Sequence, residues 1–370
     1  MMAKKLTTPI LLVEGGAQDC NLRYSTGFTA PDPVVAWVHG RSRKLVVSIL
    51  EAGRARATAA VQEVLTPQEL GLTGSARHQL AEWALGLLRR EGCTQVQVAG
   101  TFPIGIADRL RAAGIQVDVA EGPLFPNRRR KSAAEVEQIT ATQQVAVRAM
   151  RAAMRTIRSA SAAADGQLIW EGEPLTSERV RALIDMELLQ GNCVADETIV
   201  AGGEQGVEPH ERGSGPLRTG EPIVVDIFPR HRLSGYHGDI TRTVVHGRPT
   251  AAVRRMIQAV KAAQQAALQT VRAGVTVRRV HQAAQNALVA RGFETTVKNG
   301  WGQGFIHSTG HGIGLDIHEA PSVNLSSTRL FIGDVITIEP GLYYKGRGGV
   351  RFEDTVVVTK TGCRILAPCR

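Results

Sequence analysis

The C-terminal two-thirds of this 370-residue sequence carries one pattern twice, and the repeat restricts its fold more than any other feature. Residues 217–226 (Leu-x-x-Gly-Glu-x-Ile-x-Val-Asp) match residues 330–339 (Leu-x-x-Gly-Asp-x-Ile-x-Ile-Glu) at an offset of 113. Residues 239–244 (Asp-x-Thr-x-x-Val) match residues 353–358 (Glu-x-Thr-x-x-Val) at an offset of 114. Internal similarity of this kind indicates two copies of one structural unit. We therefore predict two equivalent halves.

Each matched run is rich in β-branched residues, which predicts a strand, and a carboxylate stands at the same end of the strand in both copies. Within a half, the two acids are 13 residues apart in the first copy and 14 in the second. Buried carboxylates that converge are costly without compensating positive charge. Arg242 and Arg351 could supply it, but two divalent cations would cancel all four charges. The four acids are Asp226, Asp239, Glu339 and Glu353.

A glycine- and histidine-rich stretch, residues 302–319, lies between the two acidic pairs of the repeat in the sequence. We expect one of its histidines to share a site with the four acids. Glycine allows close approach of the backbone, so Gly310-His311-Gly312 predicts an imidazole on a bent, tightly packed strand or loop. His307 and His311 have the spacing of a helical zinc pair, but no Glu follows the first histidine and the glycines disfavour a helix. We predict that His311 completes an oxygen-rich, five-ligand dinuclear site.

Short strand patterns separated by two helical patterns predict a smaller α/β domain in the first third. Prolines and basic residues from Pro123 to Lys131 mark the boundary, so we expect domains at residues 1–123 and 124–370. The expected strands are Ile10–Val13, Val34–Val38, Leu45–Ile49, Val96–Val98 and Ile115–Val119, and the expected helices are Ala76–Arg90 and Ile104–Ala113.

The second domain is expected to combine helices with antiparallel strands. A capping box at Ser132–Glu135 predicts the start of a long helix that runs to about Ser161. Further helices are expected at Ser177–Gln190, Ala251–Arg272 and Val277–Arg291, and strands at 223–226, 239–245, 335–339 and 351–358.

Composition excludes several classes of protein. The net charge of +10 is dispersed, and the one basic run, residues 128–131, has no interleaved aromatic residue, so we expect no nucleic-acid partner. Five cysteines without a Cys-x-x-Cys motif suit a reducing compartment. The apolar run Pro9–Val13 is too short for a signal sequence, and no segment approaches a membrane span. We expect a cytoplasmic protein without membrane contact.

These motifs resemble the pita-bread metallopeptidases, the group of aminopeptidase P, prolidase and methionine aminopeptidase. The resemblance covers roughly Ser132 to the C-terminus, and the first third is similar to the creatinase-type N-terminal domain, most clearly at residues 21–28. It implies an α+β protein: a C-terminal pita-bread fold with a pseudo-twofold repeat, preceded by a smaller α/β domain. The residues that carry it are Asp226, 239–243, 307–319, 338–341 and 350–355.

The resemblance also implies which residues bind each of two metal ions. Asp226 would bind one ion, Asp239 and Glu353 would bridge the two, and His311 and Glu339 would bind the other. Such ions activate water and polarise the scissile carbonyl. The family favours Mn²⁺, although Co²⁺, Zn²⁺ and Fe²⁺ also suit these ligands.

Catalytic roles follow from the same resemblance. Glu339 would act as general base and acid. His210 and His318 match histidines that hydrogen-bond the substrate and the tetrahedral intermediate, and His307 matches a histidine of the proline-directed members. Arg351 would fix the carboxylates. Relatives also suggest a homodimer.

The sequence departs from the common pattern at one place. Most members have Asp-x-Gly followed by the second Asp 11 residues after the first, whereas here Asp226 is followed by Ile-Phe-Pro-Arg and Asp239 comes 13 residues later. An even insertion keeps the strand face, so metal binding is expected to survive while the pocket wall near Phe228 changes. Among the remaining histidines, we expect His237 to be a solvated hairpin residue and His231, His246 and His281 to lie on the exterior.

Three functions are compatible with these residues. The first is a peptidase that cleaves between an N-terminal residue and a following proline, as an Xaa-Pro aminopeptidase or an Xaa-Pro dipeptidase. The second is a metal-free amidinohydrolase of the creatinase type, and the third is a non-catalytic peptide-binding member of the fold. Retention of the five ligands argues against the second and third.

Overall fold

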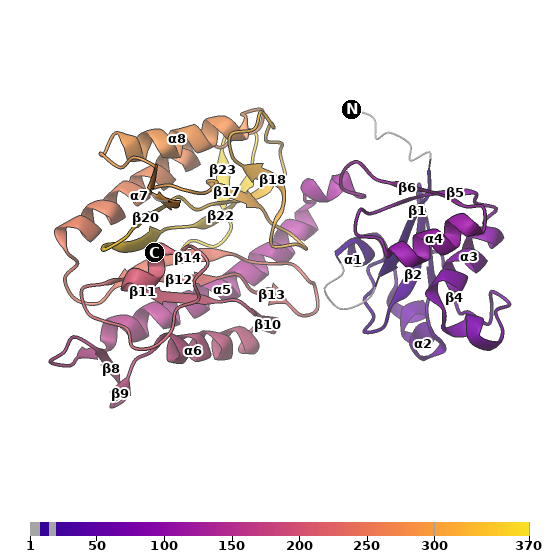
Figure 1. The fold of residues 1–370 in the computed structure, drawn as a ribbon, viewed down its shortest axis with the longest axis horizontal. Helices are drawn as coiled ribbons and strands as arrows, with labels where there is room; N and C mark the ends of the chain where they lie inside the picture. Colours follow the sequence, from indigo (N-terminus) through magenta and orange to yellow (C-terminus); the bar gives the residue numbers. More distant parts are fainter. Residues whose placement is uncertain (1–7, 15–19, 299, 370) are drawn as a thin grey trace. The chain divides into compact units, whose positions relative to one another are not determined.

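The computed structural model describes residues 8–14, 20–298 and 300–369. The chain separates into two compact units, Met1–Arg128 and Arg129–Arg370. The sequence led us to expect a division at residue 123/124. Figure 1 shows both units. Within the described residues, no helix has the length and apolar character that a membrane span requires.

The first unit is built, in its described residues, around a six-stranded sheet with the order β4-β3-β2-β1-β5-β6. Alternate residues of β1 and β2 enter two different cores, because successive side chains of a strand point to opposite faces. Leu11 and Val35 pack with α3 and α4, whereas Ile10 and Val34 pack with α1 and α2. The strands are β1 (Ile10–Glu14), β2 (Val34–His39), β3 (Ser42–Val46), β4 (Glu63–Leu65), β5 (Gln95–Val98) and β6 (Gln116–Val119); the helices are α1 (Cys20–Thr26), α2 (Ile49–Thr58), α3 (Leu80–Arg90) and α4 (Ile104–Ala112).

Two predicted elements of this unit differ from the structure by more than one residue at an end. The strand expected at Leu45–Ile49 ends at Val46, because α2 begins at Ile49. The helix expected at Ala76–Arg90 is a 3₁₀ turn, Gly74–His78, followed by α3 from Leu80. No side chain caps α3, since Gln79 makes no capping hydrogen bond.

The second unit contains two central sheets with helices outside each of them (Figure 1). Helix α5 begins with the predicted capping box, in which Ser132 and Glu135 bond each other's backbone amides. Helices α5 and α6 share a core with β11, β12 and β14, and α7 and α8 share one with β19 and β22. The helices are α5 (Ala133–Ser159), α6 (Ser177–Gln190), α7 (Ala251–Thr270) and α8 (Val277–Val289).

In each half of the repeat, the two predicted strands pair with each other in antiparallel orientation. In the first sheet, β11-β12-β14, Asp226 of β12 lies opposite Thr241 of β14. In the second, β18-β17-β19-β22-β23, Ile338 of β19 lies opposite Asp354 of β22. The bounds are β11 (Ile199–Gly202), β12 (Pro222–Ile227), β14 (Ile240–Val245), β17 (Gly310–Gly312), β18 (Glu319–Val323), β19 (Val335–Ile338), β22 (Asp354–Val358) and β23 (Cys363–Ile365).

Shorter strands complete the second unit. The connection between β19 and β22 is itself a hairpin of β20 (Gly341–Tyr344) and β21 (Gly348–Arg351), a feature that the repeat did not predict. The other short strands are β7 (Ser161–Ala162), β8 (Leu168–Trp170), β9 (Glu173–Pro174), β10 (Cys193–Val194), β13 (Arg230–His231), β15 (Thr296–Lys298) and β16 (Trp301–Gln303).

Candidate active site

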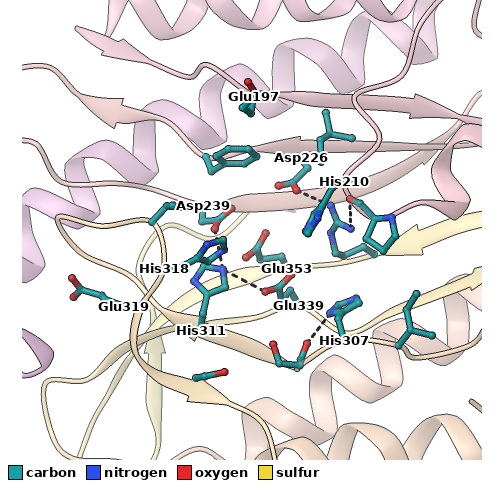
Figure 2. Close-up of a pocket in the computed structure, with 18 of the residues that line it drawn as sticks. Glu197, His210, Asp226, Asp239, His307, His311, His318, Glu319, Glu339 and Glu353 are labelled. Carbon is teal, nitrogen blue, oxygen red and sulfur yellow. Dashed lines mark hydrogen bonds and ion pairs between the residues drawn. The ribbon is translucent and has the colours of Figure 1, made fainter. Parts of the chain in front are cut away.

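Every site residue predicted from the sequence lines one pocket of the second unit, with a volume of about 1020 Å³. Figure 2 shows acids and histidines from both halves of the repeat converging on it. Asp226 comes from β12, Asp239 directly precedes β14, Glu339 directly follows β19 and Glu353 directly precedes β22. The predicted residues are His210, Asp226, Asp239, His307, His311, His318, Glu339, Arg351 and Glu353.

Three of the four acids are buried, and their hydrogen bonds leave unused oxygens. Asp226 Oδ2 accepts a hydrogen bond from Arg351 Nη2 at 2.6 Å, and Glu353 Oε2 accepts one from Thr241 Oγ1 at 2.8 Å. Among the described residues, Asp226 Oδ1 and Glu353 Oε1 are buried without any donor. A buried acceptor without a donor is costly, which indicates that these oxygens serve another ligand.

The pKa values of three acids are raised by burial and by the carboxylates around them. Burial, followed by the nearby carboxylates Glu353 and Asp226, raises the pKa of Asp239 well above its usual value. Burial also raises the pKa of Glu353, with Glu339 and Asp226 adding to the effect. Burial raises the pKa of Glu339 to about 7, against the opposing charge of Arg351. The carboxylates therefore need positive charge between them to remain ionised at neutral pH.

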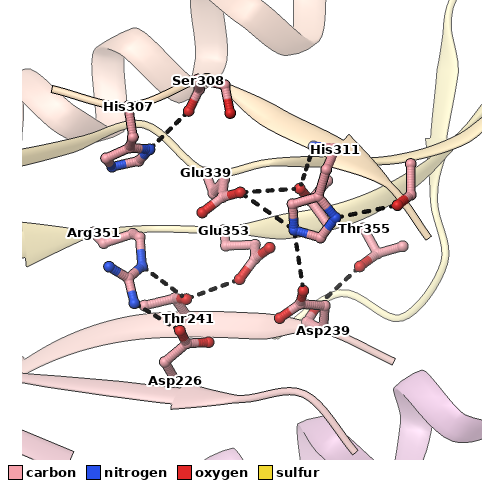
Figure 3. Close-up of polar contacts among 12 residues, drawn as sticks. Asp226, Asp239, Thr241, His307, Ser308, His311, Glu339, Arg351, Glu353 and Thr355 are labelled. Atoms are coloured by element: carbon pink, nitrogen blue, oxygen red, sulfur yellow. Dashed lines mark hydrogen bonds and ion pairs between the residues drawn. The ribbon is translucent and has the colours of Figure 1, made fainter. Parts of the chain in front are cut away.

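His311 presents one ring nitrogen to these acids (Figure 3). Its Nδ1 lies 3.2 Å from the Gly312 carbonyl, and because a carbonyl only accepts, Nδ1 carries the proton. Nε2 is then free of a proton, 3.5 Å from Asp239 Oδ2 and 3.4 Å from Glu339 Oε1. Burial lowers the pKa of His311, which favours the neutral ring that metals bind.

Close packing explains the glycines beside His311. A Cβ at Gly310 would lie 2.0 Å from the Thr337 carbonyl oxygen, and one at Gly312 would lie 2.5 Å from the carbonyl oxygens of Glu319 and Ala320. His311 thus lies on β17, a short strand pressed between β18 and β19, in agreement with the predicted tightly packed strand.

These groups suit divalent cations. Asp239, His311 and Glu353 each offer a ligand atom, and these atoms lie within 4.8 Å of one another. Oxygen ligands with one imidazole match Mn²⁺ and related ions. The unpaired oxygens of Asp226 and Glu353 and the mutual repulsion of the acids would both be relieved by bound cations.

Arg351 connects Asp226 to His307 through a residue that the sequence analysis missed. Arg351 Nη1 donates to the Tyr343 hydroxyl at 2.9 Å, while its Nη2 holds Asp226. The Tyr343 hydroxyl lies 2.9 Å from His307 Nε2, and His307 Nδ1 donates to the Ser308 carbonyl at 2.7 Å. Both ring nitrogens of His307 are therefore occupied by protein groups. Burial lowers the pKa of His307 to about 3, so the ring is neutral.

Asp239 is held through its backbone by residues that were also not predicted. Gln143 Oε1 accepts from the Asp239 amide at 2.7 Å, and Gln143 Nε2 donates to the Asp239 carbonyl at 2.7 Å. Thr355 Oγ1 donates to the same carbonyl at 2.9 Å. The threonine spacing, Asp239-x-Thr241 and Glu353-x-Thr355, was visible in the repeat and could have indicated such supporting roles. Nothing in the sequence around Gln143 carries such a signal.

The open part of the pocket is lined by histidines and also by one aromatic and one acidic side chain. The His318 ring meets the His311 ring edge to face, with 4.3 Å between centroids. His210 and His318 are exposed to the pocket. Phe228, at the place where the sequence departs from the family pattern, and Glu197 also line it. The altered wall that we expected near Phe228 therefore borders the site directly.

Four histidines differ from the expectation, and two of them, His231 and His246, are half-buried rather than exterior. His237 is half-buried rather than solvated, because its amide donates to the Gly314 carbonyl at 2.8 Å and the hairpin folds onto that loop. Burial lowers its pKa to about 4. His281 is buried rather than exterior: Nδ1 lies 2.9 Å from Thr309 Oγ1 and the ring stacks on Phe305. The helical pattern of α8 could not show which of its polar residues faces the sheet.

Comparison with known protein families identifies the class of protein to which this fold and pocket belong. Residues 137–360 match metallopeptidase family M24, so this chain belongs to that family and is a metallopeptidase with the α+β pita-bread fold. The identification of the first unit as creatinase-like stays a prediction.

Among its relatives, an Xaa-Pro dipeptidase of Pyrococcus horikoshii is 30% identical over 280 residues, which cover 75% of this chain and 74% of the relative. A prolidase structure from the same organism has a TM-score of 0.80 and 25% identity, covering 98% of this chain and 94% of that one. An X-Pro aminopeptidase structure from Thermotoga maritima, 23% identical with a TM-score of 0.81 and covering 98% and 96% of the two chains, shares the fold.

Proposed function

We propose that this chain is a two-metal peptidase that cleaves the bond between an N-terminal residue and a following proline. The observation that carries the proposal is the convergence of Asp226, Asp239, His311, Glu339 and Glu353 on one pocket. The unpaired oxygens of two of these acids support bound cations. Mn²⁺ is the proposed metal, with Co²⁺, Zn²⁺ and Fe²⁺ as competitors for the same ligands.

The proposed ligand roles follow the positions of the side chains. Asp226 would hold one ion, with Arg351 fixing its other oxygen. Asp239 and Glu353 would be shared between the ions, and His311 Nε2, which faces Glu339, would join that acid at the second ion. When bound, such ions lower the pKa of water and polarise a carbonyl group.

The chain's own groups would then handle protons and charge. Glu339 borders the pocket beside His311 and could accept a proton from the attacking water and return it to the departing amine. His210 and His318 are exposed to the pocket and could donate hydrogen bonds to the oxygen that becomes negative in the transition state.

Preference for proline is supported by relatives and by one wall of the pocket. Relatives named Xaa-Pro dipeptidase and X-Pro aminopeptidase share the sequence or the fold. Ile306 and His307 line the pocket. Because both His307 nitrogens are used by Tyr343 and Ser308, its ring would act as a flat wall against the proline ring. A homodimer and a cytoplasmic location stay predictions.

A metal analysis combined with a small substrate panel tests the proposal. We expect about two divalent ions per chain, hydrolysis of Ala-Pro or Ala-Pro-Gly, and little turnover of Ala-Ala-Gly. Loss of activity with a chelator and its return with Mn²⁺ would support the metal assignment. Protein without stoichiometric metal and insensitive to chelator would instead favour the amidinohydrolase, tested with creatine, or the non-catalytic protein.

A further inference from the structure

A buried ion pair joins the start of the second unit to the pocket. Lys131 lies one residue before the Ser132 that caps α5, and its Nζ contacts Glu319 Oε1. The two side chains are only 1% and 11% exposed. Lys131 Nζ also lies 3.4 Å from the Arg129 carbonyl. Glu319 lines the pocket and follows His318 directly in the sequence.

The surrounding backbone is shaped to admit this pair. A Cβ at Gly314 would lie 2.4 Å from Glu319 Oε1 and 3.0 Å from Lys131 Cε, so a side chain at that position would displace the pair. On the other side, the Lys131 amide donates to the Gly333 carbonyl at 2.9 Å. Lys131 is thus fixed through its backbone as well as through its charge.

Glu319 in turn fixes the segment that carries the two pocket histidines. It is the first residue of β18 and lies opposite Gly312 of β17. His318 and His311 are the residues directly before this register pair, and their rings are in contact. A shift of the Glu319 backbone would therefore move His318 relative to His311.

We propose that Lys131 is a positioning residue for His318, acting through Glu319. The inference rests on the proposed function, in which His318 donates to the developing negative oxygen. Without the Lys131 ammonium, the Glu319 side chain loses a buried charged contact, so the segment that carries His318 is held less firmly in place. Loss of a supporting residue of this kind reduces activity by roughly 10- to 100-fold.

A second buried ion pair in the same segment provides a matched control. Arg129 Nε and Nη2 donate to Asp334 Oδ1 and Oδ2 at 3.0 and 2.7 Å, and Asp334 is fully buried. Like the Lys131–Glu319 pair, it ties the first residues of the unit to a part of the chain far away in the sequence. Neither Arg129 nor Asp334 lines the pocket.

Kinetics of Lys131→Met, Glu319→Gln and the double variant, compared with Asp334→Asn, test the proposal. In metal-loaded full-length protein, we expect both single variants to lower kcat by about 10- to 100-fold with KM changed less than about threefold. Asp334→Asn should lower the melting temperature and leave kcat within about twofold of wild type.

The double variant separates positioning from stability. Replacing both partners removes the largely buried carboxylate together with the ammonium and should restore most of the melting temperature lost in Lys131→Met. If Lys131 positions His318, kcat stays low in the double variant although stability returns. If kcat recovers together with stability, or if Lys131→Met turns over like wild type, the positioning role is wrong.

A spectroscopic measurement makes the inference independent of peptidase activity. Histidine ¹⁵N spectra of the full chain loaded with diamagnetic Zn²⁺, with the His318 signal assigned by its absence in His318→Gln, report the ring directly. We expect Lys131→Met to shift the His318 signal and Asp334→Asn to leave it in place. An unmoved His318 signal in Lys131→Met overturns the inference, whereas a wild type that cleaves no Xaa-Pro peptide overturns the proposed function alone.

Discussion

The Thr241 hydroxyl donates a 2.8 Å hydrogen bond to Glu353 Oε2, although the two residues are 112 positions apart (Figure 3). The repeat-related threonine, Thr355, donates to the Asp239 carbonyl at 2.9 Å. Each half of the repeat thus supports the acid of the other half. This exchange joins β14 and β22 at the two acids that the proposed site places between the metals.

Substitution of His311 or Glu339 by Ala should abolish Xaa-Pro hydrolysis while leaving the fold largely intact. Each change removes a proposed metal ligand, and loss of metal-assisted catalysis reduces kcat/KM by at least about 10³-fold. Both variants should keep the circular dichroism spectrum of wild type. His78→Ala, at an exposed residue of the first unit, is the control for the loss of a histidine. Undiminished turnover in either site variant would refute the site.

Arg351→Lys should lower kcat/KM by roughly 10- to 100-fold. The guanidinium of Arg351 bonds Asp226, Tyr343 and Thr241 at once, at 2.6, 2.9 and 3.2 Å, whereas an ammonium cannot reproduce that fixed fork. Asp226 would be held less firmly, so we also expect weaker metal binding in a titration. Arg179→Lys tests whether any such loss is general, since Arg179 bonds three carbonyls outside the pocket. Equal metal affinity in wild type and Arg351→Lys would contradict this account.

Gly310→Ala should destabilise the second unit by about 4 kcal/mol or more. The new Cβ would meet the Thr337 carbonyl oxygen at 2.0 Å, and the Thr337 backbone cannot move aside without separating β17 from β19. Gly362→Ala is the matched control, because no atom lies within 4 Å of its Cβ, and it should change stability by less than about 0.5 kcal/mol. Urea unfolding of both variants measures the difference. Similar midpoints would show that β17 is less tightly packed than described.

The buried Cys193 should make stability fall at alkaline pH. Burial raises the pKa of its thiol to about 11 in the folded chain. Because the folded state keeps the proton longer than the unfolded state, this contribution is fully present below about pH 9 and is lost as the pH rises towards 11. The loss is at most about 3 kcal/mol, and Cys193→Ala should show a smaller fall in unfolding free energy across that range. At pH 8, native Cys193 should resist alkylation while the half-buried Cys369 reacts; equal rates would contradict its burial.

The sequence was most informative about structures that depend on a few neighbouring residues, such as helix caps and strands. The capping box predicted the first turn of α5, and the runs of β-branched residues predicted strands in both halves. The flanking glycines predicted that His311 lies on a tightly packed strand or loop, and it lies on the strand β17. The sequence could not predict the supporting roles of Tyr343 and Gln143 or the burial of His281. The partners of these residues lie far away in the chain, and no spacing rule connects them.

The sequence alone determined which chemical groups this protein has and that they come in two matched sets, because strand and turn preferences act over a few neighbouring residues. Tertiary structure alone decided which atoms meet. Arg351 donates a hydrogen bond to one oxygen of Asp226, both ring nitrogens of His307 form hydrogen bonds with protein groups, and Lys131 forms an ion pair with Glu319. Those contacts depend on how two sheets pack over more than a hundred residues of chain, and packing is a property of the whole core.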